Sequence, residues 1–139
     1  LRLSCIDASD GKVIWQSDQE ILLPMVGGGN PSFEGTYGDC LTIAEGKVYC
    51  SPGTGFVARF DARAGKMEWM HNYRPFSINR MIADSMGTAP LPQGDLLFCL
   101  PHDSNTVTAL NARTGELAWK SYLTLPKELL DDPNIDSNV

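Results

Sequence analysis

A ten-residue phrase that occurs three times is the feature that most constrains this chain. The copies occupy residues 6–15, 60–69 and 110–119. In each copy, Asp or Asn stands four residues before a glycine, Ala three before it and Trp four after it, so all three tryptophans fall in one column. Successive tryptophans are 54 and 50 residues apart. Repetition at this period predicts stacked blades or solenoid units.

Each copy of the phrase predicts a β-hairpin. Segments of alternating polarity precede and follow about four loop residues. The Asp or Asn side chain can accept hydrogen bonds from backbone N–H groups about two residues later, and the glycine supplies the positive φ that closes the turn. The Trp lies early on the returning strand. There it can pack one unit against the next, with its indole N–H donating to main chain of the adjacent unit.

The phrase resembles the Ala-x-Asp-x-x-Thr-Gly-x-x-x-Trp docking motif of quinoprotein-type (PQQ-like) β-propeller repeats. Thr stands before the glycine only at Thr114, the leading Ala is present only at Ala109, and Asn111 replaces Asp in the third copy. Three copies in register nevertheless carry the resemblance. It implies that the Trp of each copy stacks between consecutive blades. The motif positions are Asp7, Gly11, Trp15, Asp61, Gly65, Trp69, Asn111, Gly115 and Trp119.

The remaining strands predict an all-β chain of four-stranded antiparallel blades. Blade segments are expected at about residues 1–16, 39–73 and 88–122, the first being only the outer half of a blade. Residues 123–139 are expected to lead to a next blade, with a short helical stretch ending before Pro133. The whole chain, 1–139, is thus one part of a β-propeller domain. Propellers have about four to eight blades, so more chain or more copies must complete this arc.

Tight turns are expected at Glu45-Gly46 and Gln93-Gly94, joining the first two strands of each complete blade. The expected strands are Cys40–Ala44, Lys47–Ser51, Gly55–Asp61 and Lys66–His71, then Thr88–Leu91, Asp95–Leu100, Asn105–Asn111 and Glu116–Tyr122.

The connections between blades are long, and they should emerge on the same face as the loops between second and third strands. Loops longer than closure requires are where binding residues concentrate. Any one of these residues, considered alone, is more often an ordinary solvent-exposed loop residue than a binding residue. The candidate binding face consists of Asn30, Glu34, Tyr37, Thr54, Tyr73, Arg74, Asn79, Arg80, Asp84, His102, Asp103 and Asn105.

The net charge of the chain limits the classes of partner that it can bind. A net charge of −6 and a pI of about 4.7 argue against nucleic acid or an anionic membrane, which need a basic surface. No apolar run is long enough to span a bilayer. The chain begins without Met inside an expected strand, which suggests a piece of a longer polypeptide.

The cysteines allow one pairing. A three-residue loop about Glu45 would set Cys40 opposite Cys50, so a disulfide between them is conceivable. Buried free thiols, including Cys5 and Cys99, are favoured instead.

Three function classes are open. The first is a non-catalytic binding or scaffold propeller without cofactor, resembling the outer-membrane-assembly lipoprotein and binding a protein through its long-loop face. The second is a fragment of a quinoprotein dehydrogenase with PQQ and calcium, for which Glu34, Asn79, Arg80 and Asp84 are the available polar residues. The third is a sensor domain of a larger protein. The first is favoured, with no catalytic or metal-binding residues assigned, and the resemblance implies a periplasmic or otherwise extracytoplasmic location.

Overall fold

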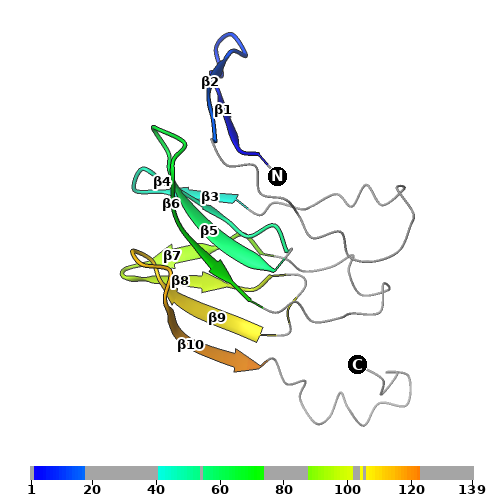
Figure 1. The fold of residues 1–139 in the computed structure, drawn as a ribbon, viewed down its shortest axis with the longest axis vertical. Helices are drawn as coiled ribbons and strands as arrows, with labels where there is room; N and C mark the ends of the chain where they lie inside the picture. The colour runs from blue at the N-terminus through cyan, green and yellow to red at the C-terminus, as the bar shows by residue number, and fades with distance from the viewer. Residues whose placement is uncertain are drawn as a thin grey trace, which may run out of the picture.

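The computed structural model describes residues 2–17, 41–53, 55–73, 88–101, 104 and 106–122. These residues form three antiparallel sheets, each a meander in sequence order. Figure 1 shows the sheets stacked one after another, with β1–β2 and β10 at opposite ends of the stack. The strands are β1 (Ser4–Ile6) and β2 (Val13–Gln16); β3 (Leu41–Ala44), β4 (Lys47–Cys50), β5 (Phe56–Asp61) and β6 (Met67–Asn72); and β7 (Leu91–Gln93), β8 (Leu96–Cys99), β9 (Thr106–Asn111) and β10 (Leu117–Tyr122).

The repeated phrase forms the turn of each outer hairpin, as its residues predict. The Asp61 carboxylate accepts hydrogen bonds from the backbone N–H groups of Arg63 (3.0 Å) and Ala64 (2.9 Å). Asn111 does the same in the third copy. The motif glycines have φ of 73°, 69° and 75°, a conformation that costs little only for glycine. Because each turn is fixed by its own residues, the three hairpins have the same shape.

The strand registers are the same in all three sheets. Arg59 pairs with Tyr49 on one side and Trp69 on the other, which gives a row across β4, β5 and β6. The third sheet repeats this row with Phe98, Ala109 and Trp119. In the first hairpin Cys5 pairs with Trp15. Side chains in one row lie on the same face of a sheet, so each motif Trp has a defined set of neighbours.

The middle sheet is covered on both faces. Along β5, Phe56, Ala58 and Phe60 belong to a buried cluster that includes Leu3 of the first hairpin. The alternate residue Val57 belongs to a second cluster, together with Tyr49, Trp69 and, from the third sheet, Leu97, Cys99, Leu110 and Ala112. Strand side chains alternate between faces, so β5 contributes to both clusters. The chain is therefore an arc of a β-propeller with two full blades and half of another.

One expectation about register was wrong, and the structure decides between two pairings that the sequence left open. The first strand of the last blade is Leu91–Gln93 rather than Thr88–Leu91, and Gln93 pairs with Leu96 around a Gly94-Asp95 turn. Pro90 and Pro92 cannot donate to a strand ladder, so regular pairing is confined to the short edge strand. In the second blade, Cys50 pairs with Leu41 across the two-residue turn, not with Cys40.

Other expectations lie outside the described residues: the position of Cys40, the long connections between blades and the helical stretch in the tail. Among the residues that the structure describes, no helix is long and apolar enough to cross a membrane.

Candidate functional site

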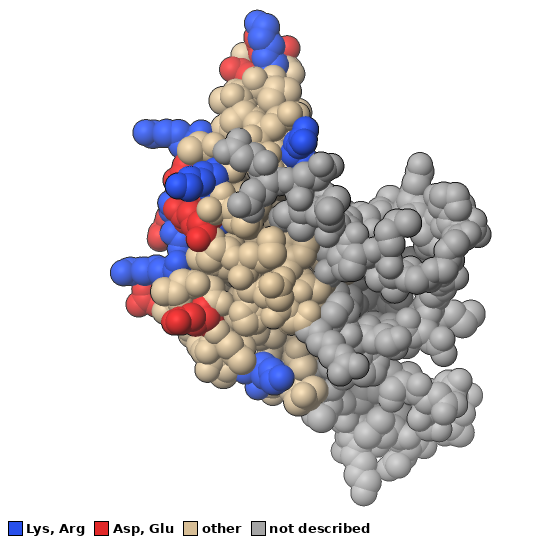
Figure 2. All heavy atoms as spheres, in the orientation of Figure 1, with Lys and Arg blue, Asp and Glu red and all other residues tan. Residues whose placement is uncertain are grey.

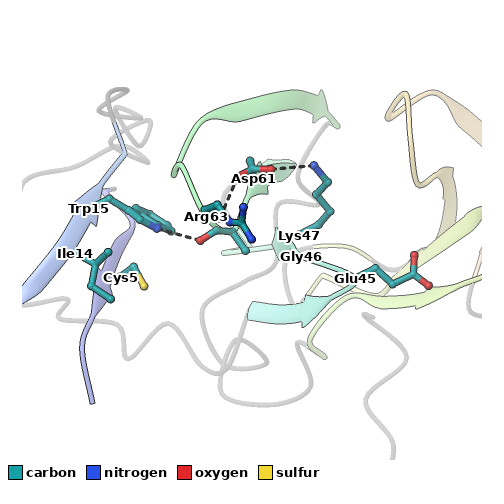
Figure 3. Close-up of a pocket in the computed structure, with 9 residues that line it drawn as sticks. Cys5, Ile14, Trp15, Glu45, Gly46, Lys47, Asp61 and Arg63 are labelled. Carbon is teal, nitrogen blue, oxygen red and sulfur yellow. Dashed lines mark hydrogen bonds and ion pairs between the residues drawn. The ribbon is translucent and has the colours of Figure 1, made fainter. Parts of the chain in front are cut away.

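The best-defined constellation of the described residues lies where one blade meets the next. At the first of these interfaces, Trp15 extends from β2 toward the turn that follows β5. Its indole Nε1–H donates to the carbonyl oxygen of Ala62 at 3.0 Å, as Figure 3 shows. The ring covers Gly65, where an added Cβ would lie 2.7 Å from the Trp15 Cδ2 atom. Only glycine therefore fits beneath this ring.

The second interface repeats this arrangement. The Trp69 indole Nε1–H donates to the carbonyl oxygen of Ala112 at 3.2 Å. A Cβ added to Gly115 would again lie 2.7 Å from the Cδ2 atom of the tryptophan above it. The Tyr49 ring lies 6.5 Å from that of Trp69, between centroids. Two interfaces built from different residues thus share one donor, one acceptor position and one glycine contact.

Arg59 gives the second interface a further bond. Its Nη1 also donates to the Ala112 carbonyl oxygen, while its Nε is 2.6 Å from Oε2 of Glu68. Its guanidinium carbon lies 5.9 Å from the centroid of the Tyr49 ring, within range of a cation–π interaction. Arg59 stands at the motif position where Ala is expected, so the sequence pattern alone marks it only as a departure from the motif.

At the first interface, Cys5 occupies the place in the row that Arg59 occupies at the second. A hollow of about 610 Å³ lies there, with Cys5, Ile14 and Trp15 on the hairpin side. Figure 3 shows these side chains facing Asp61, Lys47 and Arg63 of the middle blade. Among the described contacts, Cys5 makes no counterpart of the bond that Arg59 makes to the next blade, and a second hollow of about 500 Å³ lies beside Arg59 itself.

Charged side chains gather along one side of the stack, as Figure 2 shows, and some of those in the middle blade are paired with one another. Nζ of Lys47 lies 3.1 Å from Oδ2 of Asp61 and 2.5 Å from Oε1 of Glu68. The hydrogen bond to Glu68, then that to Asp61, raises the pKa of Lys47 above its ordinary 10.5. Hydrogen bonds from the Ala64 backbone and from Lys47 lower the pKa of Asp61 below 3.8. Each bond favours the charged form of its partner.

The described cysteines differ in exposure. Burial raises the pKa of the Cys99 thiol to about 12, so this thiol stays protonated and unreactive at neutral pH. Cys50 is also buried, in the cluster on the other face of the middle sheet. Cys5 is half-buried and free. The expectation of buried thiols thus holds for Cys50 and Cys99, while Cys5 lines the hollow.

The structure brings the motif residues together but describes little of the candidate binding face. Tyr73 is the one member of that face among the described residues, and it packs against the cluster shared by the second and third sheets. The other members are outside the described residues: Asn30, Glu34, Tyr37, Thr54, Arg74, Asn79, Arg80, Asp84, His102, Asp103 and Asn105.

A resident metal has no ligand set in the described part of the chain. Groups of three or more His, Cys, Asp or Glu side chains arranged to hold a metal ion are absent there. Four residues are available for a quinone and calcium, and all four lie outside the described residues: Glu34, Asn79, Arg80 and Asp84.

Comparison with known proteins places this arrangement in a family. Residues 2–134 match the PQQ-like repeat family described as outer membrane protein assembly factor BamB. Among curated proteins, the chain is 25% identical over 141 residues to the dehydrogenase subunit of the quinone alcohol dehydrogenase of Acetobacter aceti, with 90% of the chain covered. That match spans only 17% of the relative.

Solved structures share the fold. BamB from Moraxella catarrhalis superposes with a TM-score of 0.61 at 19% identity, covering 89% of this chain and 32% of that one. Quinohemoprotein alcohol dehydrogenase from Comamonas testosteroni gives 0.53 at 21% identity, covering 87% and 18%. The chain thus spans about a third of the first structure and less than a fifth of the second. By its matched length and its repeated blades, the chain belongs to the PQQ-like repeat family described as outer membrane protein assembly factor BamB.

Proposed function

We propose that this chain is a segment of a non-catalytic, extracytoplasmic propeller that binds a protein partner through its long-loop face. The observation that carries the proposal is the repeated interface, in which Trp15 and Trp69 each bond to the next motif turn and cover its glycine. In this proposal the motif residues dock blades rather than perform chemistry. A stack of this kind fixes the strands from which the connecting loops begin, and binding residues are often carried on loops positioned by such a scaffold.

The charged residues of the middle blade support the same conclusion. Lys47, Asp61, Glu68 and Arg59 are linked in one network that ends on the carbonyl oxygen of Ala112 in the following blade. These groups form ion pairs with each other, and Arg59 joins two blades. Their chemistry is therefore used to fix the arrangement of the repeats.

The second candidate function is that of a quinoprotein dehydrogenase segment. The 25% identity to the alcohol dehydrogenase subunit over 90% of this chain favours it. In this candidate, residues of the same loop face would contact a quinone and calcium, in place of a protein. The fold alone does not choose between the two functions.

The test of the first candidate is site-specific photo-cross-linking in the bacterial cell envelope. We expect cross-linkers at Asn79 and Asn105 to capture a discrete protein. Cross-linkers at Lys12 and Arg113, whose side chains are 82% and 80% exposed in the motif turns, serve as matched controls and should capture none. Equal capture from both sets, or capture only from the turns, would refute binding through the loop face.

A thermal-shift measurement distinguishes the dehydrogenase candidate from the scaffold candidate. A ligand that binds only the folded state raises Tm by mass action. If the chain is a scaffold segment, calcium with pyrroloquinoline quinone leaves Tm unchanged at saturating concentrations. A saturable increase in Tm that requires both ligands would instead support the dehydrogenase.

A further inference from the structure

A β-bulge leaves one residue of each motif copy outside the regular strand pairing. In the middle blade the pairing passes from Phe60 with Met67 directly to Arg59 with Trp69, so Glu68 is the extra residue of β6. The same irregularity precedes the tryptophan in the other two copies. A bulge bends the strand and re-aims a side chain. The Glu68 carboxylate at this bulge contacts one cation on β4 and one on β5.

Arg59 is the more enclosed of these two cations. Its side chain is 13% exposed, whereas that of Lys47 is 23% exposed. Its Nη1 donates to the carbonyl oxygen of Ala112, the same oxygen that accepts from the Trp69 indole. Its Nε lies 2.6 Å from Oε2 of Glu68, yet no hydrogen bond satisfies this Nε among the described residues. The contact with Glu68 therefore acts through charge more than through a directed hydrogen bond.

Glu68 supplies the negative charge that Arg59 faces. Lys47 also lies 3.1 Å from Asp61, so it keeps a carboxylate partner without Glu68. Arg59 has no second ion pair among the described residues. Two further cations, one from each blade, line the hollow beside it. An enclosed charge that loses its partner destabilises its surroundings, and at this site that charge is the Arg59 guanidinium.

The charged residues of this set, Lys47, Arg59 and Glu68, have apolar counterparts in the third blade. By strand register and bulge position, the counterparts in the same order are Leu96, Ala109 and Ala118. The three positions are thus charged together in one blade and apolar together in the other, on the same arrangement of strands. Replacement of both members of an enclosed ion pair can leave stability unchanged, whereas removal of one member is costly.

We infer that Arg59 and Glu68 form a clasp that holds the third motif turn against the middle blade, and that the clasp works only as a complete pair. With both charges present, Arg59 stays extended to the Ala112 carbonyl oxygen beside the Trp69 indole. With Glu68 neutral, the guanidinium lacks its counter-charge and turns toward water, which loosens the junction. The corresponding positions of the first hairpin carry no charge. The inference concerns this junction alone and does not depend on the proposed function.

Hydrogen exchange of two tryptophan indole N–H groups, followed by NMR, tests the inference. The Trp69 indole reports on the clasped junction, and the Trp15 indole, which is bonded to Ala62, reports on the junction without a clasp. Glu68→Gln keeps the size of the side chain and removes its charge. It should accelerate exchange at Trp69 by about tenfold or more and leave exchange at Trp15 unchanged.

The double variant is the decisive sample. Arg59→Ala combined with Glu68→Gln removes the charge that has lost its partner, so exchange at Trp69 should be slower than in Glu68→Gln alone. Asp95→Asn is the matched control. It removes a carboxylate from an ion pair of the third blade whose side chains are 76% and 80% exposed. Exchange at Trp69 should not change in this control, because exposed ion pairs contribute little to stability.

Three results would overturn the inference. The first is an unchanged rate of exchange at Trp69 in Glu68→Gln. The second is a double variant in which Trp69 exchanges as fast as in Glu68→Gln or faster. The third is equal acceleration at Trp15 and Trp69, which would indicate that the charge stabilises the whole fold rather than one junction.

Discussion

Asp61 and Asn111 occupy the same motif position and make the same two backbone hydrogen bonds. The amide oxygen of Asn thus replaces a carboxylate oxygen without loss of turn geometry. They differ in charge, because Asp61 also contacts Lys47 at 3.1 Å and its pKa is lowered, mainly by the Ala64 backbone bond. The turn therefore needs the oxygen, and the charge adds a dependence on pH.

We expect Asp61→Asn to reduce the loss of Tm on acidification. A carboxylate whose pKa is lower in the folded than in the unfolded state stabilises the fold above its ordinary pKa of 3.8, and this contribution disappears as pH falls below that value. Thermal unfolding followed from about pH 5 to pH 2 measures it. Some acid sensitivity should remain, because the pKa values of Asp7 and Asp10 are also lowered. Asn111→Asp should increase the loss, and an unchanged profile in both variants would contradict the assignment.

At the scale of elements, the contact of one tryptophan ring with one motif turn recurs at both interfaces between blades. Trp69 joins β6 to the turn after β9 through a hydrogen bond and a glycine contact. It also packs against the buried cluster that holds Leu97 and Leu110. Stacked repeats bury their apolar faces against their neighbours, so this contact contributes to the stability of the pair of blades.

Comparison of Trp69→Ala with Trp119→Ala measures that contribution. Trp69 is partly buried against the cluster, so we expect Trp69→Ala to lower the free energy of unfolding by about 3 kcal/mol, the lower end of the range for large aromatic side chains. Trp119→Ala, at the same motif position but 43% exposed, should cost about 1 kcal/mol or less in dilute protein. Urea denaturation gives both values. Equal losses of unfolding free energy in the two variants would show that the contact of Trp69 with the next motif turn does not contribute to stability.

At the scale of the whole molecule, stability is set by neighbours along the stack. The middle sheet has a buried cluster on each face, one shared with the first hairpin and the other with the third sheet. The hairpin of β1 and β2 has only two strands and depends on the middle sheet for its burial. Isolated hairpins are marginal in water, so this hairpin should open independently of the rest.

Gly65→Ala should open the hairpin selectively. Its Cβ would lie 2.7 Å from Cδ2 of Trp15, so the ring must leave the turn. Hydrogen exchange should accelerate by about tenfold or more in β1 and β2, while β8 and β9 keep their protection. Gly46→Ala has the same backbone strain without a neighbouring ring, and it should leave the exchange of β1 and β2 unchanged. Uniform acceleration through all strands would indicate global destabilisation instead.

The sequence by itself determined the features that depend on nearby residues. An Asp or Asn and a glycine four positions later close a turn whatever lies beyond it, and alternating polarity sets the strands on either side. The family resemblance came from the same local phrase. For this reason the motif turns, the blade count and most strand limits could be predicted. The candidate binding face remains a prediction, because apart from Tyr73 it lies outside the described residues.

Only the tertiary structure decided what depends on residues far apart in the chain. Arg59 reads as a departure from the motif, yet it bonds to Ala112 across 53 positions. The pairing of Cys50 with Leu41 rather than Cys40 depended on one residue more or less in a turn, because a shift of one residue changes every partner. Trp15, Trp69 and Trp119 are equivalent in sequence, but only the stacking of blades covers two of them and leaves the third exposed.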